Sequence, residues 1–192
     1  MKLYLLSCQT IQPYAERILP LLPRQRQMAY ARSRSALSLG AGLLLASVVD
    51  VHSDGDLVFG PQGKPFLAAG HPEYSLSHSG THVLLGVSDT PIGVDMERRD
   101  RPVTPAVRAR VCLPCERELD PLLVFTRKEC AMKLTGLGFG LPLHEIDTTT
   151  DYCWQGKVYR FFTTEQAGYL ISVLSAVREL PVIQCLTPEE LL

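Results

Sequence analysis

The stretch that decides the fold reads Ile92-Gly93-Val94-Asp95-Met96-Glu97, an apolar run that ends in two carboxylates separated by one residue. Because side chains alternate across a strand, Asp95 and Glu97 point to the same face. On its own, an acidic strand end is more often a solvated edge than a site. The segment therefore predicts a buried strand whose acidic face gains meaning only from what lies opposite it.

A second segment, Lys128-Glu129-Cys130-Ala131-Met132-Lys133, has helical spacing. Glu129 and Lys133 stand four residues apart and share one side of the helix, which by itself is typical of a surface ion pair. Added to Asp95 and Glu97, they place three carboxylates and one ammonium on two rigid elements. This set suits a hard divalent cation that bridges the oxygens of a diphosphate.

Composition narrows the classes of partner. The chain has 192 residues, of which 46% are hydrophobic and 20% charged, as expected for a compact globular protein. Its net charge of -1 provides no global attraction for nucleic acid, and no apolar run reaches the ~20 residues that span a bilayer. We therefore expect neither a nucleic-acid nor a membrane partner, and any phosphate site must be built locally.

The N-terminal run Leu3–Ser7 predicts a first strand. Its apolar region is shorter than the roughly 7–15 residues that a signal peptide needs. We accordingly expect a cytoplasmic protein with reduced thiols. Further strands are expected at 57–59, 74–77, 83–88, 92–97, 169–174 and 182–186, with a hairpin over 152–162. Helices are expected after Pro13, over 37–48, over 121–135 and at the C-terminus.

The order of these elements predicts an α+β fold. Strand, helix, hairpin and strand recur in both halves, which indicates two related lobes meeting near residue 92. We place an N-terminal lobe at residues 1–91 and a C-terminal lobe, which carries the acidic strand, at residues 92–192.

Four motifs occur in order along residues 60–140: Gly63-Lys64-Pro65, Leu76-Ser77-His78-Ser79-Gly80, the Ile92–Glu97 strand, and Lys128-Glu129-x3-Lys133-x2-Gly136. Together they resemble the 4'-phosphopantetheinyl transferase superfamily, in its Sfp-type, pseudo-dimeric branch. The resemblance implies two similar lobes in a pseudo-twofold arrangement, each a small antiparallel sheet packed with a long helix. It also implies Mg²⁺-dependent transfer of the phosphopantetheine arm of coenzyme A to a serine of an acyl or peptidyl carrier protein, which leaves adenosine 3',5'-bisphosphate.

The resemblance also assigns roles to residues. Asp95, Glu97 and Glu129 would hold Mg²⁺, Lys133 would contact a phosphate, and either Glu129 or a water on the metal would be the base. The residues implied in coenzyme A binding are Lys64, Pro65, Ser77, His78, Lys133 and Arg26. The chain departs from the family pattern with Phe125 in place of a tryptophan and Ser38 in place of an arginine. Four arginines, Arg24, Arg26, Arg32 and Arg34, could supply the grip on the 3'-phosphate.

Two alternatives stay open at the level of sequence. One is a metal-dependent pyrophosphohydrolase of coenzyme A or a nucleotide, and the other is a non-catalytic module that binds carrier proteins. Basic residues after the acidic strand could face an acidic carrier or form a solvated loop; they are Arg98, Arg99, Arg101, Arg108 and Arg110. We expect a monomer, and the carrier it serves is open.

Overall fold

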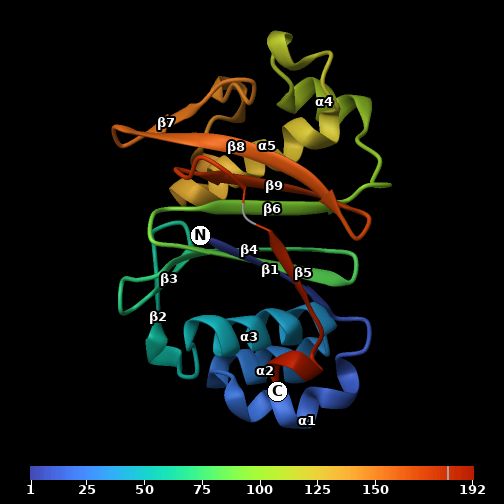
Figure 1. Cartoon of the computed structure of the whole chain (residues 1–192), viewed down its shortest axis with the longest axis vertical. Helices are drawn as coiled ribbons and strands as arrows, with labels where there is room; N and C mark the ends of the chain where they lie inside the picture. Colours follow the sequence, from blue (N-terminus) through green and yellow to red (C-terminus); the bar gives the residue numbers. More distant parts are fainter. Residues whose placement is uncertain (181) are drawn as a thin grey trace.

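In the described residues, 1–180 and 182–192, the computed structural model of the protein contains two four-stranded sheets and a small two-stranded ribbon. The two larger sheets meet in the middle of the molecule, where β6 (Gly93–Arg98) runs alongside β4 (Glu73–Ser79) (Figure 1). Helices from the first half of the chain cover the outer face of the first sheet, and helices from the second half lie at the opposite end (Figure 1).

The first sheet combines the start of the chain with its end. Its strand order is β10-β1-β5-β4, where β1 is Lys2–Ser7, β5 is His82–Ser88 and β10 is Ile183–Leu186. β1 pairs antiparallel with β5 but parallel with β10, so this sheet is mixed. The expectation of a purely antiparallel sheet is wrong for this half of the chain. The reason is topological: the chain returns from the second sheet and enters the first at the same end as β1.

Three helices and a ribbon complete the first half. They are α1 (Ala15–Ile18), α2 (Arg24–Ser33), α3 (Ala36–Val49), β2 (Leu57–Phe59) and β3 (Pro65–Leu67). The apolar helix α3 confirms the prediction over 37–48 and fills the core beneath the sheet. Helix α2 was not predicted, because it is polar and buries only Tyr30, which leaves no apolar stripe to recognise.

The second sheet is antiparallel throughout, in the order β6-β9-β8-β7, with β7 at Tyr152–Trp154, β8 at Lys157–Gln166 and β9 at Tyr169–Ser175. Helix α5 (Pro121–Thr135) packs on β6 and β9. Asp120 caps its start by accepting the Leu122 N–H, and Gly136 ends it at a φ of 71°. Helix α4 (Pro105–Val111) lies in the arginine-rich segment, where no apolar periodicity predicted it.

Gly93 sets how closely β6 approaches α5. A Cβ on Gly93 would lie 1.9 Å from the carbonyl oxygen of Cys130, so any other residue would push the strand from the helix. On the opposite face of β6, Val94 and Met96 are fully buried in the core between the two sheets. The alternation predicted for this strand is confirmed, and it turns the face that carries Asp95 toward α5.

A buried ion pair fixes α5 to the segment before it. The side chains of Lys128 and Glu116 are 1% and 0% exposed, and their charged atoms lie 2.9 Å apart. Glu116 also accepts hydrogen bonds from the backbone of Leu113 and from Thr148, while Lys128 donates to the carbonyl of Leu143. With these partners the two buried charges hold α4, the loop before β7 and α5 in one arrangement.

A long helix on each of two small sheets confirms the predicted α+β class. The pseudo-twofold relation and the boundary between residues 91 and 92 stay predictions. None of the helices in the described part of the chain is long and apolar enough to cross a bilayer.

Candidate active site

Asp95 lies at the junction of the two sheets and α5. It is 5% exposed, and its Oδ1 accepts hydrogen bonds from the Ser77 hydroxyl on β4 and from the Lys133 ammonium on α5, both at 2.7 Å. Lys133 is therefore bound across the β6–α5 interface, whereas sequence spacing had suggested a pair with Glu129 along the helix. This contact joins the acidic strand Ile92–Glu97 to the helical segment Lys128–Lys133.

Glu97 lies two residues further along β6, at a more exposed position. Its Oε2 accepts a hydrogen bond from the Ser79 hydroxyl at 2.7 Å, and its Oε1 pairs with the guanidinium of Arg101. Arg101 also stacks over the ring of Phe125, 5.1 Å from its centroid. In this arrangement a protein cation neutralises Glu97.

Glu129 on α5 faces the same region. Burial raises the pKa of Glu129, and the nearby charge of Asp95 raises it further, while Lys133 and Arg101 oppose both effects. A carboxylate whose charge is disfavoured by burial and by a like charge is suited to accept a proton or to bind a cation.

The donor set fits a divalent cation. Within residues 1–180 and 182–192 no three acidic, histidine or cysteine side chains are already gathered around a metal position, and Glu97 is paired with Arg101. Asp95 Oδ2, however, is buried and has no hydrogen-bond partner among these residues. A buried carboxylate oxygen without a partner is costly, and a cation would satisfy it. Carboxylate oxygens are the ligands that Mg²⁺ prefers.

Three serines of β4 connect its edge to the edge of β6. The hydroxyls of Ser75, Ser77 and Ser79 accept hydrogen bonds from the backbone N–H groups of Val94, Met96 and Arg98 at 3.1–3.2 Å. They replace the main-chain ladder that would otherwise satisfy this edge. The seam between the sheets is therefore built from side chains, and two of them, Ser77 and Ser79, also bind the carboxylates.

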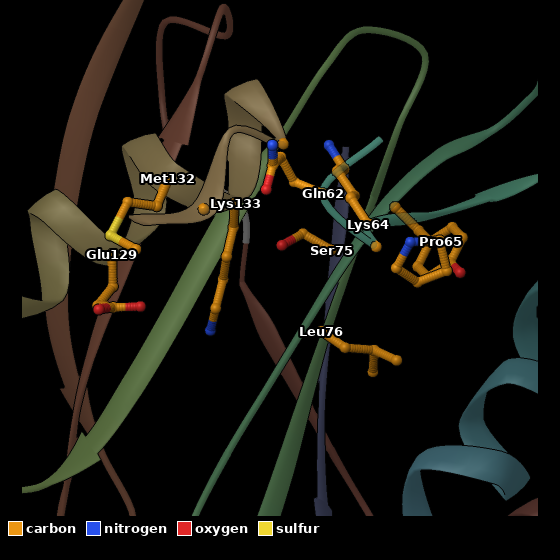
Figure 2. Close-up of a pocket in the computed structure, with 12 residues that line it drawn as sticks. Gln62, Lys64, Pro65, Ser75, Leu76, Glu129, Met132 and Lys133 are labelled. Carbon is orange, nitrogen blue, oxygen red and sulfur yellow. The ribbon is translucent and has the colours of Figure 1, made fainter. Parts of the chain in front are cut away.

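A pocket of about 340 Å³ opens beside Lys133, lined on one side by α5 and on the other by β4 and the Gly63-Lys64-Pro65 turn. Figure 2 shows Lys133 extending between Glu129 on one side and Ser75 and Leu76 on the other. Four of the predicted site residues line this pocket: Lys64, Pro65, Glu129 and Lys133.

Lys64 also contacts the end of α5. Its Nζ donates to the carbonyl of Leu134 at 3.0 Å, where the negative end of the helix dipole favours a cation. The ammonium lies 4.9 Å from the ring centroid of Phe66, and burial lowers the pKa of Lys64. Lys64 thus ties the turn of the first half to the helix of the second.

A second pocket holds three more of the predicted residues. Arg26, Ser77 and His78 line it together, and it shares Leu76 with the pocket beside Lys133. Arg26 is half-buried, and burial lowers its pKa. The other arginines considered from the sequence, Arg24, Arg32 and Arg34, are exposed. Every predicted residue except Asp95 and Glu97 therefore lines one of two adjoining pockets, and Asp95 is joined to both through Ser77 and Lys133.

The comparison with known families matches the part of the chain that carries the carboxylates. A family model described as the 4'-phosphopantetheinyl transferase superfamily matches residues 91–185, which carry β6, α5 and all three carboxylates. Residues 91–185 are therefore assigned to the 4'-phosphopantetheinyl transferase superfamily. This match confirms the family indicated by the four motifs and implies a transferase of phosphopantetheinyl groups. No curated protein matches the chain by sequence.

Two residues of this phosphopantetheinyl transferase were not recognised as site residues from the sequence. Ser79 was quoted only as part of a motif, and Arg101 only as a basic loop residue, yet both bind Glu97. The period-two spacing of Ser75, Ser77 and Ser79 is the signal that could have indicated a polar strand face. Nothing in the sequence shows that Arg101 folds back four residues onto Glu97.

The raised pKa of Glu129 predicts how the metal-free transferase responds to pH. A carboxyl group whose pKa is higher in the folded state stabilises the fold below its unfolded pKa of about 4.3, and that contribution is lost as pH rises through the folded value. The glutamine side chain of Glu129→Gln is uncharged over the whole pH range. The variant should therefore melt a few degrees higher than wild type near pH 8, and the difference should vanish near pH 4.

Thermal midpoints measured from pH 4 to 8 in a chelator test this expectation. Glu145→Gln, at a side chain that is 70% exposed, is the control and should leave the profile unchanged. A wild type that melts above Glu129→Gln at pH 8 would show that Glu129 is stabilised as a carboxylate.

Proposed function

We propose that the protein transfers the 4'-phosphopantetheine arm of coenzyme A to a serine of an acyl or peptidyl carrier protein, with Mg²⁺, and releases adenosine 3',5'-bisphosphate. It would act as an Sfp-type enzyme, since the first half of the chain supplies residues to both pockets. The observation that carries the proposal is Asp95, whose Oδ1 is held by Ser77 and Lys133 while its buried Oδ2 has no partner among the described residues.

Asp95, Glu97 and Glu129 would hold the cation. When bound, Mg²⁺ supplies charge neutralisation to the pyrophosphate oxygens of the substrate. Glu97 must exchange its pair with Arg101 for this role, and an ion pair with a half-exposed arginine contributes only about 0.2–1 kcal/mol.

The chain's own residues perform the remaining steps. Glu129, which lines the pocket beside Lys133, takes the proton of the attacking carrier serine. Lys133 extends between Glu129 and Ser75 in the pocket and stabilises the negative charge that moves onto the leaving phosphate (Figure 2). Both side chains project from α5, so the helix sets the distance between proton acceptor and phosphate contact.

Coenzyme A would lie along the two adjoining pockets. Arg26 and His78 line the pocket away from the carboxylates and would bind the 3'-phosphate. Lys64 and Pro65 line the pocket near Lys133, where the ammonium of Lys64 would face the ligand from the end of α5. Leu76, shared by both pockets, gives the ligand an apolar surface to cross.

The carrier would dock on α4. This helix exposes Val107 next to the basic residues Arg108 and Arg110, a combination that suits an acidic amphipathic helix. The other arginines of the cluster are neutralised locally: Arg98 pairs with Asp100, and Arg99 with Asp120 and Glu165.

One assay tests the proposed reaction. The protein is incubated with Mg²⁺, coenzyme A and a panel of apo carriers, and each carrier is weighed by mass spectrometry. A phosphopantetheine increment supports transfer, and the rates rank the carriers. Free phosphopantetheine phosphate would indicate a pyrophosphohydrolase, and no reaction with any carrier would indicate a binding module.

His78→Ala is expected to raise KM for coenzyme A about tenfold with little change in kcat, because the lost contact is with a phosphate away from the reacting atoms. With dephospho-coenzyme A the difference between wild type and variant should be much smaller. His144→Ala, at a side chain that is 75% exposed, is the control. An equal loss with both cofactors would place His78 outside the 3'-phosphate site.

A further inference from the structure

Three serines of β4 form the seam with β6, and two of them, Ser77 and Ser79, also bind a carboxylate. Each hydroxyl accepts one backbone N–H of β6, at Val94, Met96 and Arg98 in turn. A hydroxyl that accepts such a bond keeps its own proton to donate. The repeat of two residues on both strands places the three hydroxyls in equivalent positions along the seam.

The donated protons go to the carboxylates. Ser77 donates to Asp95 Oδ1 and Ser79 to Glu97 Oε2, each at 2.7 Å, which is the short distance of a hydrogen bond to a charged acceptor. The residue that occupies the corresponding place beside Ser75 is Gly93, which has no side chain. Ser77 and Ser79 therefore each bind a carboxylate, whereas Ser75, among the residues that the structure describes, binds only the backbone of β6.

Holding one oxygen of a carboxylate fixes the direction of the other. Ser77 and Lys133 both bind Oδ1 of Asp95, and this leaves Oδ2, buried and without a partner in the described part of the chain, as the atom presented to a ligand. Ser79 fixes Glu97 in the same manner through Oε2. The other oxygen, Oε1, pairs with Arg101 and would leave that partner to bind a ligand.

On the basis of the function proposed above, we propose that Ser77 and Ser79 are positioning residues that orient Asp95 and Glu97 for a divalent cation. Each of these serines bonds both to a backbone N–H of β6 and to the carboxylate of the residue just before that N–H. The seam between the sheets therefore sets the direction of each carboxylate. Partners of this kind, one bond removed from the ion, commonly change metal affinity by about 10–100-fold.

The seam also provides a matched control. Ser75→Ala removes the same backbone contact as Ser77→Ala and Ser79→Ala, but it removes no bond to a carboxylate. Ser79→Thr keeps the hydroxyl at a position that is half-buried. Ser79 also keeps the test open should the buried Ser77→Ala variant fail to fold.

Binding of Mn²⁺ in the presence of coenzyme A is measured by the loss of the free-ion signal in electron paramagnetic resonance, against a coenzyme A blank. We expect Ser79→Ala and Ser77→Ala to bind Mn²⁺ about tenfold more weakly than wild type. Ser75 lines the pocket beside Lys133, so coenzyme A is kept at saturation in every sample. Under that condition Ser75→Ala should bind Mn²⁺ more tightly than Ser77→Ala and Ser79→Ala, and Ser79→Thr should recover most of the affinity.

Two results would overturn the proposal. If Ser77→Ala and Ser79→Ala bind Mn²⁺ as tightly as Ser75→Ala while wild type transfers phosphopantetheine, the positioning role is wrong and the proposed function stands. If wild type takes up no Mn²⁺, both the positioning role and the metal part of the proposed function are wrong.

Discussion

Asp95→Asn is expected to lower kcat/KM for phosphopantetheine transfer by about 10³-fold or more. The amide has the shape of the carboxylate and can still accept the Ser77 hydrogen bond through its oxygen. It loses the charge that binds Lys133 and replaces the unpartnered Oδ2, as seen among the described residues, with an NH₂ group that repels a cation. The loss should therefore appear without a large change in fold.

Initial rates with a saturating apo carrier, together with thermal midpoints, measure both parts of this prediction. Asp100→Asn is the matched control, because Asp100 lies in the loop after β6, is 67% exposed and pairs only with the exposed Arg98 among the described residues. It should retain nearly full activity. Turnover of Asp95→Asn within tenfold of wild type would remove Asp95 from the metal site.

Lys133→Met is expected to lower kcat and kcat/KM together by about 10²-fold, as for other groups that stabilise charge developing in a transition state. The structure adds an expectation for stability. A plain i,i+4 partner of Glu129 would contribute about 0.3–0.5 kcal/mol. Lys133 instead binds the buried Asp95 at 2.7 Å, so its loss should destabilise the metal-free protein by about 1–3 kcal/mol.

Lys133→Arg should recover little activity, because a planar guanidinium does not replace a compact ammonium between Asp95 and the pocket. Lys157→Met, at an exposed position of the β7–β8 hairpin, is the control for losing one lysine. Denaturant unfolding in a chelator and single-turnover kinetics separate the two effects. Near-normal turnover with a lower midpoint would leave Lys133 a purely structural partner of Asp95.

Local patterns predicted most of the elements that surround the site. The alternation in Ile92–Glu97 predicted β6, and the Asp120 cap with the Gly136 stop predicted α5. The polar helices α2 and α4 escaped prediction, because their stability comes from what they pack against and not from an apolar stripe of their own. The family resemblance supplied the residues that line the two pockets, including Lys64, His78 and Arg26.

The partners of the site residues could not be read from the sequence. Ser77 and Asp95 are 18 residues apart, and Asp95 and Lys133 are 38 apart, so no local period relates them. Their contacts depend on how two sheets and a helix dock. That docking requires a glycine at position 93, because a Cβ there would lie 1.9 Å from the carbonyl oxygen of Cys130.

The sequence by itself therefore determined most of the strands, the apolar helix α3 and helix α5, as well as which face of β6 is acidic and which family the chain resembles. Hydrophobic period, caps and turn residues act within a few positions along the chain, so they leave a readable local pattern. Only the tertiary structure decided that Lys133 binds Asp95, that Arg101 binds Glu97, and that the serines of β4 hold both carboxylates. Those pairings follow from the close packing of elements distant in sequence, where each buried polar atom must find whichever partner the packing brings near.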